Sequence, residues 1–189
     1  MNKGKIIVLN GVSSSGKTTL AKAIQETFSE PYIRLSIDDF INMMPEKIIK
    51  TDLGNTVYKS QTIMLQAITM LSDAGTNVVV DNVMLTYFQT LKQYVTALHN
   101  YPVLLVKVDC PTHELRRREA ERGDRNIGQG EGQVNDLEPQ SLYDIAVNTF
   151  MNTTAECVSF IEKKLASSDV VSAMQQLYSA EKNMKTINI

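Results

Sequence analysis

A glycine- and serine-rich segment near the start of the chain has the composition of a phosphate-binding loop. It fits the pattern G-x-x-x-x-G-K-[ST]. The glycines allow a sharp backbone turn that brings N–H groups close to phosphate oxygens, and the N-terminus of a following helix adds a favourable dipole. The residues that make up the pattern are Gly11, Val12, Ser13, Ser14, Ser15, Gly16, Lys17 and Thr18.

The last two residues of this pattern predict the cofactors. We expect Lys17 to reach the β- and γ-phosphates of a nucleotide and the hydroxyl of Thr18 to ligate Mg²⁺. An apolar run ends immediately before the pattern, and an amphipathic stretch begins within it, as a strand–loop–helix arrangement requires. The sequence therefore predicts a site for ATP and Mg²⁺.

Acidic residues stand at the ends of three later apolar runs. They are Asp38 and Asp39, Asp81, and Asp109. Ligands of open parallel sheets bind beyond the carboxyl ends of the strands, so we expect Asp38 and Asp81 to face the phosphate loop. One carboxylate would accept a proton from an attacking hydroxyl, and the other would help to hold Mg²⁺. The alternative for Asp39 and Asp109 is an ordinary helix cap, of a helix over 40–44 and of one starting near Pro111.

Five of the six arginines lie within ten residues, in a segment that we interpret as part of a lid over about 112–140. We expect Arg122 and Arg125 to stabilise charge on a phosphoryl group, since guanidinium groups bind phosphate bidentately. The alternative for Arg116 and Arg117 is ion pairing along a solvated helix. The acidic partners available for such pairs are Glu114, Glu119 and Glu121.

Short apolar runs alternate with longer amphipathic stretches, which predicts an α/β fold. We expect strands over 5–10, 31–37, 77–81, 103–109 and 144–149, and helices over 17–29, 57–73, 87–99, 112–122 and from about 151 onwards. Strands separated by helices imply right-handed crossovers and a parallel sheet covered on both faces. We expect one domain over 1–189, with an added C-terminal helix over about 168–187.

The composition excludes several classes of partner. The chain has 189 residues and a net charge of −2, so it has no overall basic field for nucleic acid or an anionic membrane. No apolar run is long enough to span a bilayer, and the N-terminus does not resemble a signal peptide. Cys110 and Cys157 are too few for a disulfide framework. We therefore expect a cytoplasmic protein, and its oligomeric state stays open.

Several blocks of the sequence together resemble the chloramphenicol phosphotransferase-like family of small P-loop kinases. The blocks are the phosphate loop 11–18, then 36–41 followed by Met44-Pro45, 80–85, 118–125 with Gly128 and Gln133, and Tyr143-Asp144. The resemblance covers about 5–164. It implies a three-layer P-loop kinase fold with about five parallel strands in the order 2-3-1-4-5.

The resemblance also implies an activity, namely ATP-dependent phosphorylation of the primary 3-hydroxyl of chloramphenicol or a similar antibiotic. Asp38 would take the proton of that hydroxyl, and Arg122 and Arg125 would belong to the lid. The sequence departs from the family at Asn148-Thr149, where an Asp-Thr pair is usual, and it lacks a histidine within 134–141. Both departures question the substrate more than the ATP site.

An acceptor pocket is expected beyond the second and third strands. Its predicted lining residues are Asp38, Phe40, Met43, Met44, Asp81, Val83, Met84 and Tyr87. The apolar members suit an apolar or aromatic acceptor, and core packing is their plain alternative.

Two other functions are compatible with these residues. One is a kinase of a nucleoside or another metabolite, and the other is a nucleotide-binding switch protein without an acceptor. The chain has no guanine-reading Asn-Lys-x-Asp motif. The carboxylates at the strand ends and the arginine segment favour phosphoryl transfer over a switch.

Overall fold

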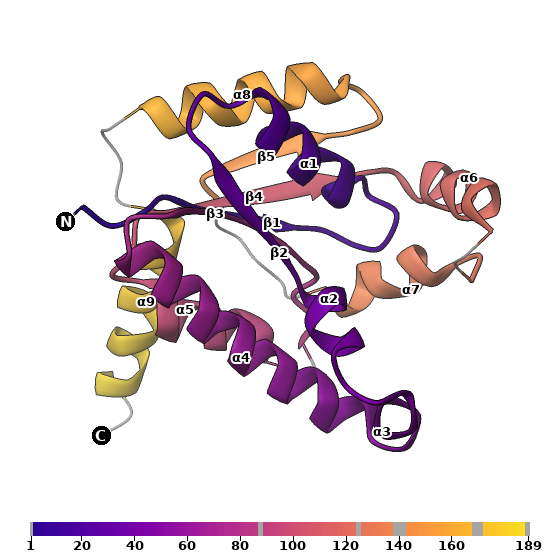
Figure 1. Cartoon of the computed structure of the whole chain (residues 1–189), viewed down its shortest axis with the longest axis horizontal. Helices are drawn as coiled ribbons and strands as arrows, with labels where there is room; N and C mark the ends of the chain where they lie inside the picture. The colour runs from indigo at the N-terminus through magenta and orange to yellow at the C-terminus, as the bar shows by residue number, and fades with distance from the viewer. Residues whose placement is uncertain (1, 87–88, 124–125, 138–142, 168–171, 188–189) are drawn as a thin grey trace.

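The computed structural model describes residues 2–86, 89–123, 126–137, 143–167 and 172–187. Figure 1 shows a central sheet with helices on both faces. The strands are β1 (Ile6–Asn10), β2 (Tyr32–Ser36), β3 (Asn77–Asn82), β4 (Val103–Asp109) and β5 (Ile145–Asn148). The helices are α1 (Lys17–Thr27), α2 (Ile37–Asn42), α3 (Glu46–Thr51), α4 (Leu53–Asp73), α5 (Thr90–Leu98), α6 (Thr112–Arg122), α7 (Gln129–Asp136), α8 (Thr154–Ala166) and α9 (Ala173–Ile187).

The five strands form one parallel sheet in the order β2-β3-β1-β4-β5, which confirms the predicted fold. The register decides which strand ends meet. Leu9 of β1 is opposite Asp81 of β3, and Asp81 is in turn opposite Ser36 of β2. The loop after β1 and the acidic end of β3 therefore begin side by side.

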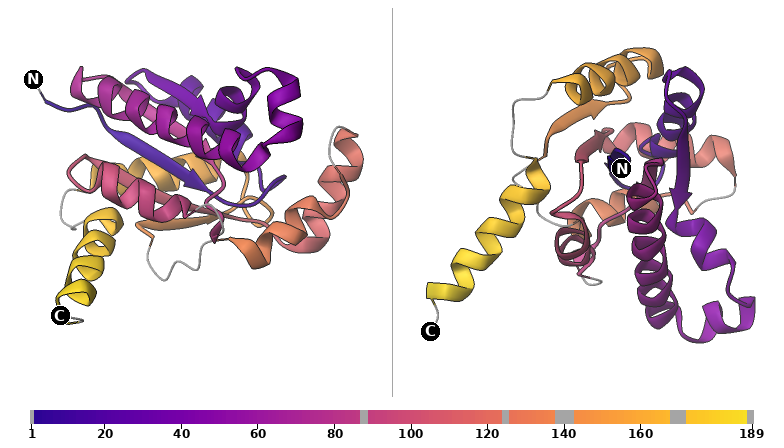
Figure 2. Two further views of the ribbon diagram at one scale, coloured as in Figure 1. Left: turned by 90° about the horizontal axis from the view of Figure 1, so that it is seen from below. Right: turned by 60° about the vertical axis from the view of Figure 1, so that its left-hand side comes forward.

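Two helical layers cover the sheet, as Figures 1 and 2 show. Successive side chains of a strand point to opposite faces of the sheet, so the continuously apolar β1 packs against both helical layers. Its Ile6 and Val8 pack with residues of α4, α5 and α9, whereas Ile7 and Leu9 pack with residues of α1 and α8. All four side chains are fully buried.

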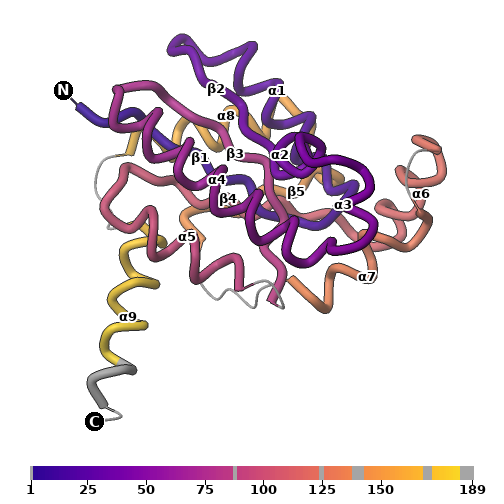
Figure 3. Tube along the Cα trace, turned by 60° about the horizontal axis from the view of Figure 1, so that its bottom comes forward, coloured from indigo at the N-terminus to yellow at the C-terminus, as the bar shows by residue number. Residues whose placement is uncertain are grey.

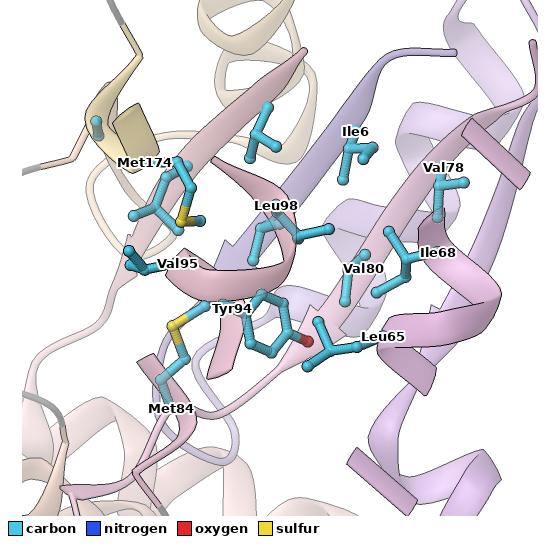
Figure 4. Packing of buried hydrophobic residues seen from close by; sticks show 14 of the residues in the cluster. Ile6, Leu65, Ile68, Val78, Val80, Met84, Tyr94, Val95, Leu98 and Met174 are labelled. Atoms are coloured by element: carbon cyan, nitrogen blue, oxygen red, sulfur yellow. The ribbon is translucent and has the colours of Figure 1, made fainter. Parts of the chain in front are cut away.

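The core on the α4–α5 side also contains a residue that was predicted to line a ligand pocket. Figure 4 shows Met84 among the packed apolar side chains, close to Tyr94 and Val95 of α5. Met84 is 0% exposed. The prediction that its side chain lines the acceptor pocket is therefore wrong for this structure, and core packing explains this methionine.

Several elements differ from the sequence-based expectation in ways that affect the site. The strand predicted over 31–37 ends at Ser36, so Asp38 lies in the first turn of α2. The helices α3 and α7 were not predicted, and α4 begins at Leu53 instead of Val57. Tyr87, predicted at the acceptor pocket, lies outside the described residues.

The predicted C-terminal helix is present as α9 and is tied to the sheet. One carboxylate oxygen of Asp144 accepts a hydrogen bond from Ala173 N at 2.8 Å, and the other accepts one from Leu105 N at 2.6 Å. Met174 of α9 is fully buried. Leu177 and Tyr178 pack against the same core, and Figure 3 shows α9 continuing away from the rest of the chain after them. Within the described residues, no helix combines the length and the apolar character needed to cross a membrane.

Candidate active site

The phosphate loop connects β1 to α1 and is largely buried. Lys17 is 6% exposed, and its ammonium group donates a hydrogen bond to Val12 O at 2.8 Å, across the loop. Gly16 has φ 94°, in the left-handed region that glycine adopts without a steric penalty. Ser14 adopts φ 62° without that freedom. The loop therefore holds a specific, partly strained backbone conformation.

Thr18 and Asp81 meet at the mouth of this loop. The hydroxyl of Thr18 donates a hydrogen bond to a carboxylate oxygen of Asp81 at 2.5 Å. The contact follows from the register, because Asp81 is opposite Leu9, which lies two residues before the loop. The two residues proposed from the sequence as metal ligands are thus brought together.

Asp38 faces the same cleft from α2. The cleft has a volume of about 410 Å³. Its lining includes most of the residues predicted at the nucleotide site, together with Asp38, Asp81 and Val83. The other lining residues come from β2, β3, α6, α7, the segment after β5 and the start of α8. They include Ser36, Asn82, Arg118, Arg122, Gln129, Gln133, Thr149, Thr154 and Cys157.

The arginine segment divides into residues that face the cleft and residues that pair with carboxylates. Arg122 lines the cleft, and Arg125 lies outside the described residues. Arg116 pairs with Glu131 of α7. Arg117 pairs with Glu114 and Glu121, as the ion-pair alternative from the sequence anticipated.

Arg118 contacts the phosphate loop directly, which the sequence reasoning did not foresee. Its guanidinium donates to Ser14 O at 3.3 Å, to Thr149 Oγ1 at 3.0 Å and to Thr149 O at 3.0 Å. Glu114 accepts its Nε–H at 2.8 Å. The spacing along the helix could have indicated this contact, because Arg118 lies four residues after Glu114 and four before Arg122 and therefore shares their helix face.

Glu114 is buried and is held ionised by its arginine partners. The hydrogen bonds from Arg117 and then from Arg118 lower the pKa of the Glu114 carboxyl to about 2, against the opposing effect of burial. A buried carboxylate that keeps its charge fixes both guanidinium groups. The inner face of α6 therefore has a defined position beside the phosphate loop.

A second buried carboxylate attaches α7 to α6. Glu119 is 0% exposed and accepts hydrogen bonds from Gly128 N and Gly130 N, both at 2.7 Å. One turn further along α7, the side-chain oxygen of Gln133 accepts a hydrogen bond from Ser13 N at 2.7 Å. The base of the predicted lid is thus bonded to the phosphate loop in this structure.

The predicted acceptor residues are only partly gathered at the cleft. Asp38, Asp81 and Val83 line it, whereas Met43 is 73% exposed and does not. Phe40 packs against the core on the α4 side. Met44 is half-buried and is also not among the lining residues. The described part of the cleft is consequently more polar than the sequence suggested.

The other acidic residues at strand ends make local ion pairs instead of helix caps. Asp39 pairs with Arg34 at 2.9 Å, and Asp109 pairs with Lys107 at 3.0 Å. The helix caps suggested as their alternative role are wrong, because α2 begins before Asp39 and the cap position of α6 is Pro111.

The departure from the family pattern at Asn148-Thr149 has a structural explanation. The side-chain oxygen of Asn148 accepts hydrogen bonds from Phe150 N and Met151 N, each at 3.0 Å. An amide oxygen can fill this acceptor role as a carboxylate would. Thr149 donates to Ser15 O at 2.6 Å, so the loop after β5 supports the phosphate loop.

The site suits a magnesium ion that is bound largely by substrate oxygens. Mg²⁺ is usually held by one or two protein oxygens together with phosphates and water. Thr18 and Asp81 supply hard oxygen ligands of that kind. The described residues contain no cluster of three or more His, Cys, Asp or Glu side chains that could hold a metal without a substrate.

The phosphate loop after the central strand and the five-stranded order define a P-loop kinase fold. A sugar kinase structure from Janibacter superposes with a TM-score of 0.67 at 18% identity, covering 89% of this chain and 98% of that one. The APS kinase of Mycobacterium tuberculosis in complex with AMPPNP and APS gives a TM-score of 0.64 at 16% identity, covering 88% and 100%. These likenesses concern the fold.

Sequence comparison identifies the family within this class. The model of the chloramphenicol phosphotransferase-like proteins matches residues 4–166. The chain therefore belongs to the chloramphenicol phosphotransferase-like family. A Mycobacterium tuberculosis relative named "Putative O-phosphotransferase" is 30% identical over 175 aligned residues, which cover 79% of this chain and 76% of the relative.

Proposed function

We propose that this protein is an ATP-dependent phosphotransferase that transfers the γ-phosphate to a hydroxyl group of a small molecule. The observation that carries the proposal is one cleft that holds the phosphate loop, the Thr18–Asp81 pair and the carboxylate of Asp38. A nucleotide, a metal ion and a proton acceptor are the parts that phosphoryl transfer to a hydroxyl requires. Membership of a phosphotransferase family supports the same reaction.

Each residue has a distinct part in this proposal. Lys17 and the loop amides hold the β- and γ-phosphates, and Thr18 with Asp81 would hold Mg²⁺, which offsets phosphate charge when bound. Asp38 accepts the proton of the attacking hydroxyl. Arg122, together with Arg125, offsets charge on the transferred group. Catalysis consists mainly of positioning and electrostatic stabilisation.

The acceptor is an alcohol, either the 3-hydroxyl of chloramphenicol or a similar antibiotic, or a hydroxyl of a polar metabolite. Family membership supports the antibiotic. The polar lining of the described cleft, with Ser36, Asn82 and Gln129, supports a polar metabolite such as a nucleoside. The apolar residues Met43 and Met84, which suited an aromatic acceptor, are not part of that lining.

A coupled assay of ADP release tests the proposed function. The protein would be supplied with ATP, Mg²⁺ and a panel of hydroxylated compounds that includes chloramphenicol, nucleosides and sugars. We expect one class of alcohol to stimulate ADP release and to gain a phosphate, detected by mass spectrometry. ATP binding without stimulation by any alcohol would favour a nucleotide-binding switch and would contradict the proposal.

The proposal extends to the organisation of the chain. The whole of 1–189 forms one P-loop kinase domain, with a lid over about 112–140 and an added C-terminal helix. Its partners are a nucleotide and a small molecule, with no nucleic acid. Since ATP is produced and consumed inside the cell, the proposed location is the cytoplasm.

A further inference from the structure

One side chain of the lid is bonded to the phosphate loop in an orientation that the chemistry fixes. A backbone N–H can only donate, so the Gln133 atom that lies 2.7 Å from Ser13 N must be the carboxamide oxygen. Exchanging the oxygen and nitrogen of this amide would place two donors against each other. The carboxamide oxygen of Gln133 therefore faces Ser13 N, and the carboxamide nitrogen faces away from it.

The other end of the same carboxamide remains available for a ligand. Gln133 lines the cleft. Within the described part of the chain, its Oε1 bond to Ser13 is the hydrogen bond that Gln133 makes, and its nitrogen has no protein acceptor there. An amide nitrogen carries two N–H donors. The side chain thus presents donors into a space that would hold phosphate.

The position of this side chain relative to Lys17 indicates which ligand group it would meet. The Lys17 ammonium contacts the loop at Val12 O, and the Gln133 oxygen contacts it at the next residue, Ser13. Val12 O and Ser13 N–H belong to one trans peptide bond and point in opposite directions, so the two side chains approach this peptide from its two sides. Both side chains also line the same cleft, where a terminal phosphate would lie between them.

The backbone that carries Gln133 is held in place by close packing. Gly130 lies one turn before it on α7, and a Cβ on this glycine would be 2.6 Å from Ser13 O. Only the missing side chain allows α7 to approach the loop so closely. The buried carboxylate of Glu119 fixes the first turn of the same helix through Gly128 N and Gly130 N. Gln133 is thereby placed with little freedom to move.

We propose that Gln133 is a phosphate-binding residue whose Nε2 donates a hydrogen bond to the terminal phosphate of the bound nucleoside triphosphate, while its Oε1 holds Ser13 N–H. A neutral donor can bind a phosphate oxygen through a charge-assisted hydrogen bond without adding a further charge to the site. The residue distinguishes a triphosphate from a diphosphate. This inference rests on the proposed function, because it assumes that the loop binds ATP.

Isothermal titration of ATP and ADP tests the inference without knowledge of the acceptor. Gln133→Glu keeps an oxygen for Ser13 N–H but replaces the donor with a negative charge. We expect it to weaken ATP binding by roughly 10- to 100-fold, and ADP binding by much less. Gln129→Glu is the matched control, because it makes the same charge change on the same helix and in the same cleft. We expect that control to change the ATP-to-ADP affinity ratio by less than about threefold.

Each outcome decides between the claims. An unchanged affinity ratio in Gln133→Glu, or an equal change in Gln129→Glu, would overturn the inference while the proposed function stands. Absence of ATP binding by the wild-type protein would overturn the proposed function and this inference with it. Should Gln133→Glu fail to fold by circular dichroism, Gln133→Met replaces it as a neutral variant of similar size. A Met variant with the wild-type affinity ratio would likewise overturn the inference.

Discussion

The two sides of the cleft are constructed differently. On the nucleotide side, the phosphate loop receives contacts from α6, α7 and the segment after β5, through Arg118, Gln133 and Thr149. On the side proposed for the acceptor, α2 contributes Ile37 and Asp38 to the lining, and neither α2 nor the following α3 has a buried residue. Met43 between them is 73% exposed.

This difference indicates when each side acquires its working shape. A loop that is hydrogen-bonded by three neighbouring segments is already ordered before the nucleotide binds. Nucleotide binding therefore costs little conformational entropy in the protein. The contacts of α2 with the core come from Ile37 and Phe40, which are only partly buried, so less packing resists a displacement of this side. We therefore expect the nucleotide side to be a preformed site and the acceptor side to adjust when its ligand binds.

The largest effect is expected from removing the ammonium group of the nucleotide side. Lys17→Ala should abolish phosphoryl transfer, with a loss in kcat of at least on the order of 10³-fold, and it should also weaken ATP binding. ADP release and calorimetric titration would measure the two effects. Circular dichroism provides the control for folding, because Lys17 also bonds to Val12 O. Turnover within tenfold of the wild type would contradict the role of Lys17.

A change on the acceptor side should affect chemistry but not nucleotide affinity. Asp38→Asn removes the proposed base, so we expect kcat to fall by roughly 10²- to 10³-fold while the Kd for ATP stays within about twofold. The control is Asp39→Asn, since Asp39 is its neighbour on α2 but pairs with Arg34. Near-normal turnover in Asp38→Asn would make Asp81 the candidate base.

The close approach of α7 to the phosphate loop can be broken with one methyl group. Gly130→Ala places a Cβ 2.6 Å from Ser13 O, and we expect it to lower the free energy of unfolding by about 1–3 kcal/mol. Gly132→Ala, two residues along the same helix, meets nothing within 4 Å. That control should be neutral or stabilising by up to about 1 kcal/mol. Equal thermal unfolding of the two variants would contradict this account of α7.

A smaller effect is expected from the pH dependence of stability. The pKa of Glu114 is lowered in the folded protein from 4.5 to about 2, so folding favours the ionised carboxylate. Its contribution is complete above about pH 4.5 and is lost as the pH falls from there towards 2. Denaturant unfolding across this range should show a shallower loss of stability in Glu114→Gln. Parallel curves for the variant and the wild type would show that Glu114 has no such role.

The parallel strands and the meeting of Thr18 with Asp81 could be expected from the residues alone, whereas the order of the strands was implied by the resemblance to the family. Continuous apolar runs identify buried parallel strands, and the carboxyl ends of such strands share one edge. The helix Thr112–Arg122 was also predicted with the bounds that the structure has. The strands, their shared edge and this helix depend on local patterns, which a single sequence contains.

The features that sequence reasoning missed depend on packing between distant segments. The helix α7 contains Gly130 and Gly132, which disfavour helix formation, and it is stabilised by Glu119 and by contact with the phosphate loop. The contact of Arg118 with Ser14 joins residues that are 104 positions apart. The sequence alone also could not decide whether Met84 lines a cleft or packs in the core, because an apolar side chain is compatible with both environments.

The central position of β1 has a consequence for the synthesis of the protein. Ile6 pairs with Val78 and with Val103, so this strand leaves the ribosome long before either neighbour exists. At 5–20 residues per second, the wait for β3 alone is roughly 4–14 seconds. During that time a fully apolar run of four residues has no sheet to join. Ile7 and Leu9 can already pack against α1 at that stage, so we expect α1 to cover one face of this strand until its neighbours in the sheet are synthesised.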